Sequence, residues 1–189
     1  MREDDGGDAA STDTYTPDFD VEPGRIAYGC WRFAGSDLDA AVDKIEAALD
    51  VGMTLIDTAD IYGYETPGFG AAEELLGEVL EEVPGLRERM VLATKGGIFP
   101  PLPYDSGADH LTQACDASLN RLRVDHIDLY QIHRPDLLAH PQEVAETLMG
   151  LRTAGKIREI GVSNHNPAQT QALQAYLDAP IVTTQPEFS

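Results

Sequence analysis

Four short apolar segments of this chain are each followed by polar side chains of a kind used in proton or hydride transfer. Asp57, Lys95 and His133 follow three of them, and Ser163 with Asn164 follows the fourth. The segments are residues 51–56, 90–94, 127–132 and 157–162. If they are parallel strands of one barrel, their carboxyl ends share one rim, which is where barrel enzymes place their active sites. The sequence therefore predicts that these side chains gather at that rim.

Tyr62 lies in the loop that follows Asp57. A tyrosine hydroxyl is a weak acid at neutral pH, and a nearby ammonium favours its phenolate form. Lys95 is placed to supply that ammonium, and Asp57 can pair with Lys95 and keep it charged. His133 can donate a hydrogen bond to a substrate oxygen or assist the proton transfer. Together these four residues would form an acid that protonates an oxygen as charge develops on it.

Ser163, Asn164 and Gln185 lie at the ends of two further expected strands. One interpretation is that they form turns or helix caps, since Ser and Asn favour helix starts. The other uses their hydroxyl and two side-chain amides to hold a carboxamide, the polar group of a nicotinamide ring. Trp31 is the only tryptophan, and it either packs in the fold or forms a wall of the substrate pocket.

Each of these residues also has an ordinary structural role, because an aspartate before a helix is often a cap and a histidine after a strand is often a core group. Their joint placement at successive strand ends favours chemistry. The aspartates near this rim also suggest a metal-dependent hydrolase; they are Asp57, Asp60, Asp105 and Asp136. However, no H-x-H or H-E-x-x-H pair is present, so we expect no metal site.

Strand and helix signals alternate along the chain. The expected strands are residues 25–31, 51–57, 90–95, 127–133, 157–163 and 181–185, and the expected helices begin near Ser36, Ala71, His110, Pro141 and Asn166. This alternation predicts a parallel sheet with right-handed crossovers, which fits both a closed barrel and an open doubly wound sheet. No G-x-G-x-x-G or P-loop motif supports the open sheet. Polar residues at many strand ends favour the barrel.

Length and charge set the class of protein. The 189 residues are 42% apolar, enough for the core of one domain. The formal charge is −20, from 33 acidic and 13 basic residues, which argues against a basic surface for nucleic acid or anionic lipid. Only three lysines are present. We expect adaptation to high salt, in which ions screen the repulsion among the many carboxylates. The alternative is an ordinary acidic cytosolic protein.

Cys30 and Cys115 lie far apart without metal-ligand spacing, so we expect buried free thiols in a reducing compartment. Residues 1–24 are acidic and rich in Gly, Asp, Ser and Thr. We expect them to form a disordered or loosely attached arm, followed by one barrel domain at residues 25–189. No signal-peptide pattern and no long apolar stretch is present, which predicts a soluble cytoplasmic protein without membrane contact.

Five segments resemble, in order and spacing, the signatures of the aldo-keto reductase superfamily. They are D-T-A-D-I-Y-G at 57–63, T-K-G-G at 94–97, D-L-Y-Q-I-H-R-P-D at 128–136, G-K-I-R-E-I-G-V-S-N at 155–164 and Q-P-E-F-S at 185–189. The resemblance runs from Ile26 to the last residue and is highly specific, because separate motifs agree. The chain is most similar to the bacterial and archaeal branch of predicted oxidoreductases in that superfamily.

The resemblance implies a (β/α)8 TIM barrel that reduces an aldehyde or ketone to an alcohol with NADPH. It assigns a catalytic tetrad, with a tyrosine as general acid, and three residues that hold the nicotinamide carboxamide. By position these are Asp57, Tyr62, Lys95 and His133 for the tetrad, and Ser163, Asn164 and Gln185 for the carboxamide.

The chain departs from the superfamily at its end. A full barrel usually needs about 250 residues, so we expect an incomplete barrel with about six of its eight βα units. The last two units of the family carry the groups that bind the phosphates of the cofactor. Without them we expect unpaired strand edges that favour aggregation or a completing chain. The expected function is a reductase of which this chain is a fragment; the alternatives are a non-catalytic NADPH-binding or regulatory subunit and an inactive truncated product.

Overall fold

The computed structural model describes residues 15–101 and 104–187. The strands are β1 (Tyr28–Gly29), β2 (Leu55–Asp57), β3 (Val91–Gly96), β4 (Ile127–Ile132), β5 (Ile157–Ser163) and β6 (Ile181–Gln185). The helices are α1 (Leu38–Asp50), α2 (Ala71–Glu82), a short 3-10 helix (Arg87–Arg89), α3 (Ala108–Leu122), α4 (Pro141–Thr153) and α5 (Pro167–Gln174). The predicted alternation of strands and helices is confirmed.

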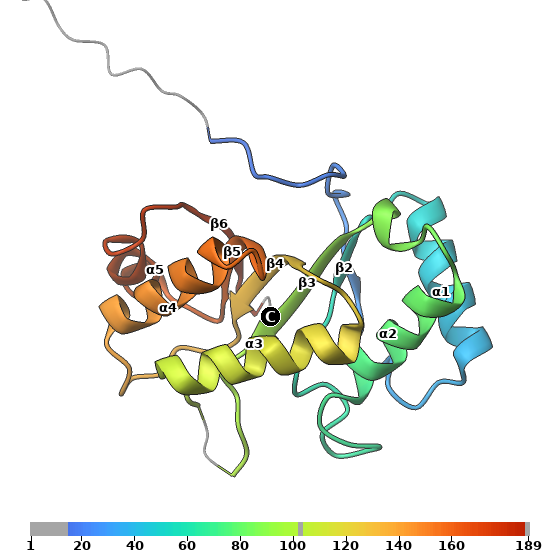
Figure 1. The fold of residues 1–189 in the computed structure, drawn as a ribbon, viewed down its shortest axis with the longest axis horizontal. Coiled ribbons are helices and arrows are strands. Elements are labelled where there is room, and N and C mark those ends of the chain that lie inside the picture. The colour runs from blue at the N-terminus through green and yellow to red at the C-terminus, as the bar shows by residue number, and fades with distance from the viewer. Residues whose placement is uncertain (1–14, 102–103, 188–189) are drawn as a thin grey trace, which may run out of the picture.

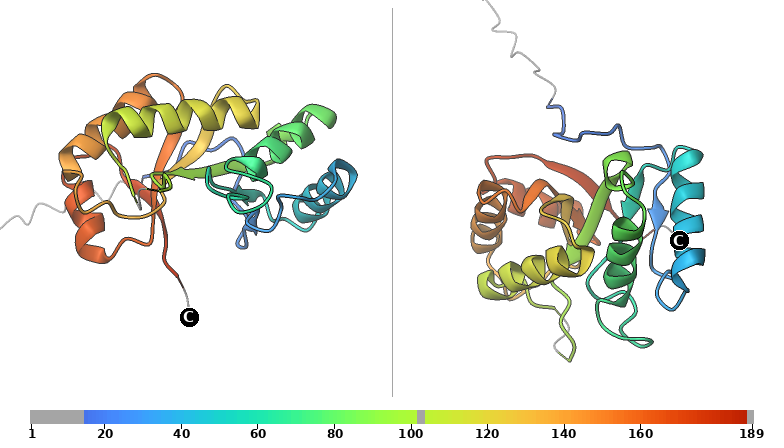
Figure 2. Two further views of the ribbon diagram at one scale, coloured as in Figure 1. Left: turned by 90° about the horizontal axis from the view of Figure 1, so that it is seen from below. Right: turned by 45° about the vertical axis from the view of Figure 1, so that its right-hand side comes forward.

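The strands form one sheet in which every neighbouring pair is parallel. They follow chain order, β1-β2-β3-β4-β5-β6. A doubly wound sheet has a point where this order reverses, and there is none along these strands. The sheet curls, and the helices cover its outer face (Figures 1 and 2). The fold is therefore the predicted incomplete (β/α)8 barrel, and the open-sheet alternative is wrong.

Local sequence signals fix the helices that cover the sheet. Asp37 caps α1 by accepting a hydrogen bond from the Ala40 N–H at 2.8 Å. Asn166 and Gln169 cap α5 reciprocally, each side chain accepting from the backbone N–H of the other. The apolar stripe of each helix packs on the sheet and supplies the core, which includes Ile45, Leu76, Leu111, Leu148 and Leu173. These helices hold the strand ends in place.

Two strands are shorter than the sequence predicts. The expected strand at residues 25–31 is reduced to β1, and before it Gly24 passes so close to Gly52 that an added Cβ would lie 2.0 Å from the Gly52 oxygen. Trp31 follows β1 in a turn rather than ending the strand. Gly52 adopts a φ of +84° at the end of α1, so β2 starts only at Leu55. Val51, expected at the start of the second strand, likewise lies in a turn.

Residues 15–24 differ from the loose arm expected for residues 1–24; residues 1–14 lie outside the described residues. The segment crosses the amino ends of the strands (Figure 1). The Tyr15 hydroxyl lies 2.8 and 2.9 Å from the two carboxylate oxygens of the buried Glu159, and the Asp18 N–H donates to Glu159 at 2.6 Å. Asp20 pairs with Arg158 at 2.7 Å. These contacts fasten the segment across the end of the barrel opposite the rim where β2 to β5 finish.

Within the described residues, β1 and β6 each pair on one side only, so the sheet has two open edges. Cys30 and Cys115 are free and buried, as predicted, and burial raises the pKa of both thiols. No helix in the described part of the chain is long and apolar enough to cross a membrane.

Candidate active site

A buried lysine joins the ends of β2 and β3. Lys95 has an exposed fraction of 0%, and its ammonium donates to Asp57 Oδ2 at 2.7 Å, to the Thr58 carbonyl at 2.9 Å and to the Tyr62 hydroxyl at 3.0 Å. All three N–H donors of the ammonium are thus satisfied. The ammonium also lies 4.8 Å from the centre of the Tyr62 ring. Asp57, Lys95 and Tyr62 therefore form one connected polar group, as predicted.

The backbone around Tyr62 is held by turns. The Tyr62 N–H donates to Ala59 at 3.1 Å, and the Tyr62 carbonyl accepts from Ala72, in the first turn of α2, at 3.2 Å. Gly63 has a φ of +96°, and a Cβ there would lie 2.9 Å from the Ala71 Cβ and from a backbone oxygen. Only glycine therefore fits directly after the tyrosine.

Two glutamines support Asp57 from β4 and β6. Gln131 Nε2 donates to Asp57 Oδ1 at 3.1 Å, and Gln185 Nε2 donates to Asp57 Oδ2 at 3.2 Å. Gln131 was not among the residues predicted from the sequence, although a glutamine inside an apolar strand is a detectable signal of a buried polar contact. Gln185, expected to hold a carboxamide, also takes part in the network of Asp57.

His133 lies at the end of β4 with its ring edge-on to Tyr62, 5.8 Å between ring centres. Burial, together with the charges of Lys95 and Arg134, lowers the pKa of His133 to about 3. Its Nδ1 atom is buried and has no hydrogen-bond partner among the described residues. The neutral ring can therefore offer one hydrogen bond to a substrate oxygen without carrying a charge beside Lys95.

Ser163, Asn164 and Gln185 lie next to one another at the ends of β5 and β6. Asn164 has a φ of +57° and its Nδ2 donates to the His133 carbonyl at 3.1 Å and to Ser163 Oγ at 2.9 Å. Ser163 Oγ donates to the Gln185 carbonyl at 3.1 Å. A role in shaping the turns is therefore compatible with a role in holding a ligand, because these side chains bond the backbone of the rim and also line the cleft.

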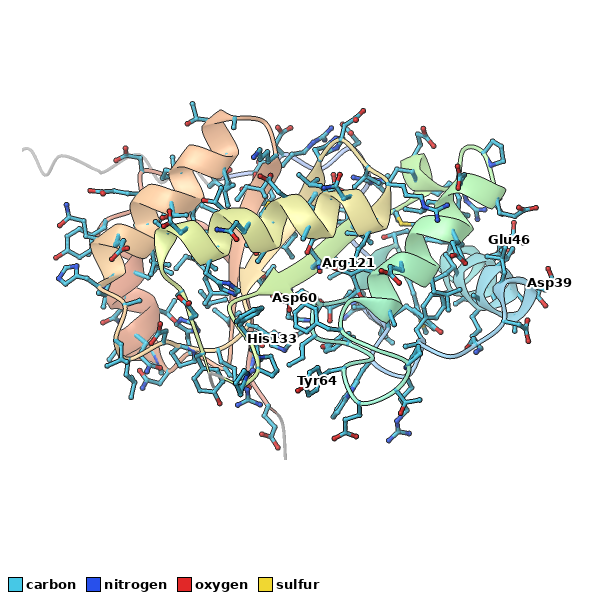
Figure 3. The ribbon with its side chains drawn as sticks, turned by 60° about the horizontal axis from the view of Figure 1, so that its bottom comes forward. Asp39, Glu46, Asp60, Tyr64, Arg121 and His133 are labelled. Carbon is cyan, nitrogen blue, oxygen red and sulfur yellow. The ribbon has the colours of Figure 1, made fainter. Side chains whose placement is uncertain are left out.

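These residues line one open cleft of about 910 Å³. Tyr62, His133, Ser163, Asn164 and Gln185 contribute to its wall, while Lys95 and Asp57 lie beneath Tyr62. Trp31 forms another part of the wall; its ring stacks on Tyr62 at 6.4 Å and is 74% exposed. His133 and Tyr64 mark the cleft in Figure 3. Every site residue predicted from the sequence thus belongs to this one region.

Three of the four aspartates that suggested a metal site, Asp57, Asp105 and Asp136, accept hydrogen bonds within the protein. Asp136 accepts from the backbone of Ser106 at 3.0 Å and of Leu138 at 2.8 Å, and Asp105 accepts from Gly107 at 2.9 Å. Asp60 is buried, and neither of its carboxylate oxygens has a hydrogen-bond partner among the described residues. Burial and the nearby Glu73 carboxylate hold the pKa of Asp60 well above its usual range.

The model of the aldo/keto reductase family matches residues 25–189. The chain belongs to this family. It is 57% identical over 167 residues to a 6-dehydroglucose reductase of Novosphingobium aromaticivorans, covering 87% of this chain and 55% of the relative. It is 39% identical to the aldo-keto reductase YhdN of Bacillus subtilis, covering 93% of this chain and 53% of the relative.

Solved structures agree with this family membership. A glycerol dehydrogenase from Gluconobacter oxydans is 37% identical with a TM-score of 0.72, covering 88% of this chain and 50% of that protein. An aldo/keto reductase from Klebsiella pneumoniae, solved with NADP and acetate, is 34% identical with a TM-score of 0.65, covering 78% of this chain and 48% of that protein. The chain therefore spans about half the length of the relatives that it matches.

Proposed function

We propose that the protein containing this chain reduces a carbonyl group to an alcohol with NADPH, and that Tyr62 donates the proton. The observation that carries this proposal is the ammonium of Lys95, which bonds both Asp57 and the Tyr62 hydroxyl. NADPH would supply the hydride to the carbonyl carbon. Tyr62 would release its proton to the carbonyl oxygen, and the ammonium would stabilise the phenolate that remains.

The rim residues fit a nicotinamide carboxamide. Asn164 and Gln185 use their amide N–H groups within the protein, and neither side-chain carbonyl oxygen accepts a hydrogen bond from the described residues. Those two oxygens can accept from a carboxamide NH₂ beside Tyr62 and His133. NADP in the solved Klebsiella relative favours the same class of cofactor. We propose that the groups for the cofactor's phosphates belong to the two further βα units of a longer protein.

We further propose that the substrate is an aldehyde derived from a hexose, such as 6-dehydroglucose, because a 57% identical relative is named for that reaction. The cleft suits a polyhydroxylated molecule. The exposed indole of Trp31 offers a flat apolar face for a sugar ring, and Arg32, Glu65 and Arg134 line the same cleft. These charged groups can bond several hydroxyls.

The test is oxidation of NADPH, and of NADH for comparison, with 6-dehydroglucose, glycerone and a simple aliphatic aldehyde. It uses the protein with its complete barrel. We expect turnover with NADPH and the highest kcat/KM for the sugar aldehyde. Turnover of the aliphatic aldehyde alone would contradict the sugar substrate. An absence of turnover with every carbonyl would favour the alternative of a non-catalytic binding or regulatory subunit.

We also propose that the protein works in a cytoplasm of high salt, on the basis of its charge of −20. Molar salt should screen the repulsion among its carboxylates and raise the melting temperature by about 5 °C or more. As a control, the same comparison near the isoelectric point of about 4.3 should give a smaller shift, because the net charge is then close to zero. A midpoint that salt leaves unchanged at neutral pH would contradict the proposal.

A further inference from the structure

A second polar cluster lies on the outer face of β3, opposite the cleft. Successive side chains of a strand point to opposite faces, so Thr94 points outward where Lys95 points inward. Thr94 Oγ1 donates to Glu73 Oε1 at 2.5 Å. Glu73 lies in the first turn of α2 and has an exposed fraction of 0%. The mechanism proposed above does not use this buried carboxylate, so its presence needs another explanation.

Arg121 of α3 completes the cluster. Its Nε and Nη2 atoms each lie 2.7 Å from Glu73 Oε2, so both oxygens of the carboxylate are occupied. The backbone is shaped to admit this guanidinium. Gly70 has a φ of +84°, and a Cβ there would lie 2.5 Å from Arg121 Cδ. Figure 3 shows Arg121 reaching from α3 toward the region of Asp60. Arg121 therefore balances the negative charge of Glu73. The nearby carboxyl group of Asp60 is also buried, and its raised pKa means that a second negative charge there would be costly.

The cluster connects the loop of Tyr62 with β3, which are the same two chain segments that the active site connects. On the inner face, the Lys95 ammonium bonds the Tyr62 hydroxyl at 3.0 Å. On the outer face, Thr94, the neighbour of Lys95, bonds Glu73. Ala72, the neighbour of Glu73, donates its N–H to the Tyr62 carbonyl at 3.2 Å. The loop of Tyr62 is thus attached to β3 both through its hydroxyl and through the start of α2.

We propose that Glu73, held by Thr94 and Arg121, is a positioning residue that keeps the Tyr62 hydroxyl within hydrogen-bond distance of Lys95. Glu73 fixes the position of the first turn of α2. The hydrogen bond from the Ala72 N–H to the Tyr62 carbonyl then couples the backbone of Tyr62 to that turn. The inference rests on the proposed function for its effect on turnover, while the position of the loop can be measured without any reaction.

The first test compares Glu73→Gln with Glu74→Gln. The two variants make the same chemical change in adjacent residues, but Glu74 is exposed and outside the cluster. In Glu73→Gln one carboxylate oxygen becomes an NH₂ group that faces a donor. We expect amide hydrogen exchange at Ala72 to become about tenfold faster, relative to Leu92 in β3, in this variant only. The emission of Trp31, which stacks on Tyr62, should shift with it.

Turnover gives the second readout. In the protein with its complete barrel, kcat of Glu73→Gln should fall about a hundredfold with a nearly unchanged KM, because a small displacement of the proton donor is costly. Glu74→Gln should match the wild type. Thr94→Val and Thr94→Ser give an independent pair if Glu73→Gln does not fold. The valine variant should behave like Glu73→Gln, and the serine variant, which keeps the hydroxyl, should restore both readouts.

The outcomes separate the two proposals. Unchanged exchange at Ala72 in a folded Glu73→Gln or Thr94→Val variant would overturn the positioning role. So would an equal acceleration at Ala72 and Leu92, because that result describes a general loss of stability. If the wild type reduces no carbonyl, the proposed function fails, but the exchange at Ala72 and the emission of Trp31 still decide whether Glu73 positions the loop.

Discussion

Replacing Tyr62 with phenylalanine should lower kcat for carbonyl reduction by about 10² to 10⁴-fold, the usual contribution of a positioned general acid. The ring would keep its stacking on Trp31, so only the hydroxyl that bonds Lys95 is lost. Cofactor affinity should stay within about twofold, because the proposed carboxamide contacts come from other residues. Steady-state kinetics with NADPH, together with direct titration of the cofactor, measure both quantities.

Tyr64→Phe is the matched control for this experiment. Tyr64 lines the same cleft two residues later, is 51% exposed and makes no hydrogen bond through its hydroxyl to the described residues. Its variant should keep kcat within about threefold of the wild type. If Tyr62→Phe retained a comparable rate, the proton would have to come from another group, and the central assignment of the proposed function would be wrong.

Replacing Lys95 with methionine should damage both folding and reaction. The variant leaves the buried carboxylate of Asp57 without its cation, and only the amides of Gln131 and Gln185 still contact it. Breaking one side of a buried ion pair typically lowers the free energy of unfolding by about 3 to 5 kcal/mol. Reduction should also fall to the level of Tyr62→Phe or below, because no ammonium remains to stabilise the phenolate. Chemical denaturation and the carbonyl assay measure the two effects.

The double variant Asp57→Asn with Lys95→Met distinguishes an unpaired charge from a loss of packing. Removing both charges should recover most of the stability lost in Lys95→Met, while activity stays absent. If the losses of the two single variants instead added up in the double variant, the ion pair would not be the source of the instability. The lysine would then act on stability mainly through its buried hydrocarbon chain.

Much of the fold and the site followed from the sequence, because both depend on short-range patterns. Alternating strand and helix signals predicted the parallel sheet. Parallel strands in a barrel end at one rim, so Asp57, Lys95 and His133 had to approach one another. The structure brings them together around Tyr62. The sequence also favoured the barrel over the open sheet through its polar strand ends, and the order of the strands confirms that choice.

Some features could not be predicted, because they depend on which residues meet after folding. Glu73 and Arg121 look like ordinary charged helix residues in the sequence, and their pairing arises only where α2 packs beside α3. The attachment of residues 15–24 likewise depends on Glu159, which lies inside β5 far along the chain. Composition alone made that segment resemble a loose arm.

The sequence by itself determined the order of elements, the family and the identity of the side chains at the rim, because motif spacing and apolar periodicity are local properties. Only the tertiary structure decided how those side chains bond. It showed that one ammonium serves Asp57 and Tyr62 together, that two glutamines from separate strands support the aspartate, and that a buried ion pair lies behind the tyrosine loop. The reason is physical: burial and hydrogen-bond partners are set by packing between distant segments, and that packing decides which charges a site can hold.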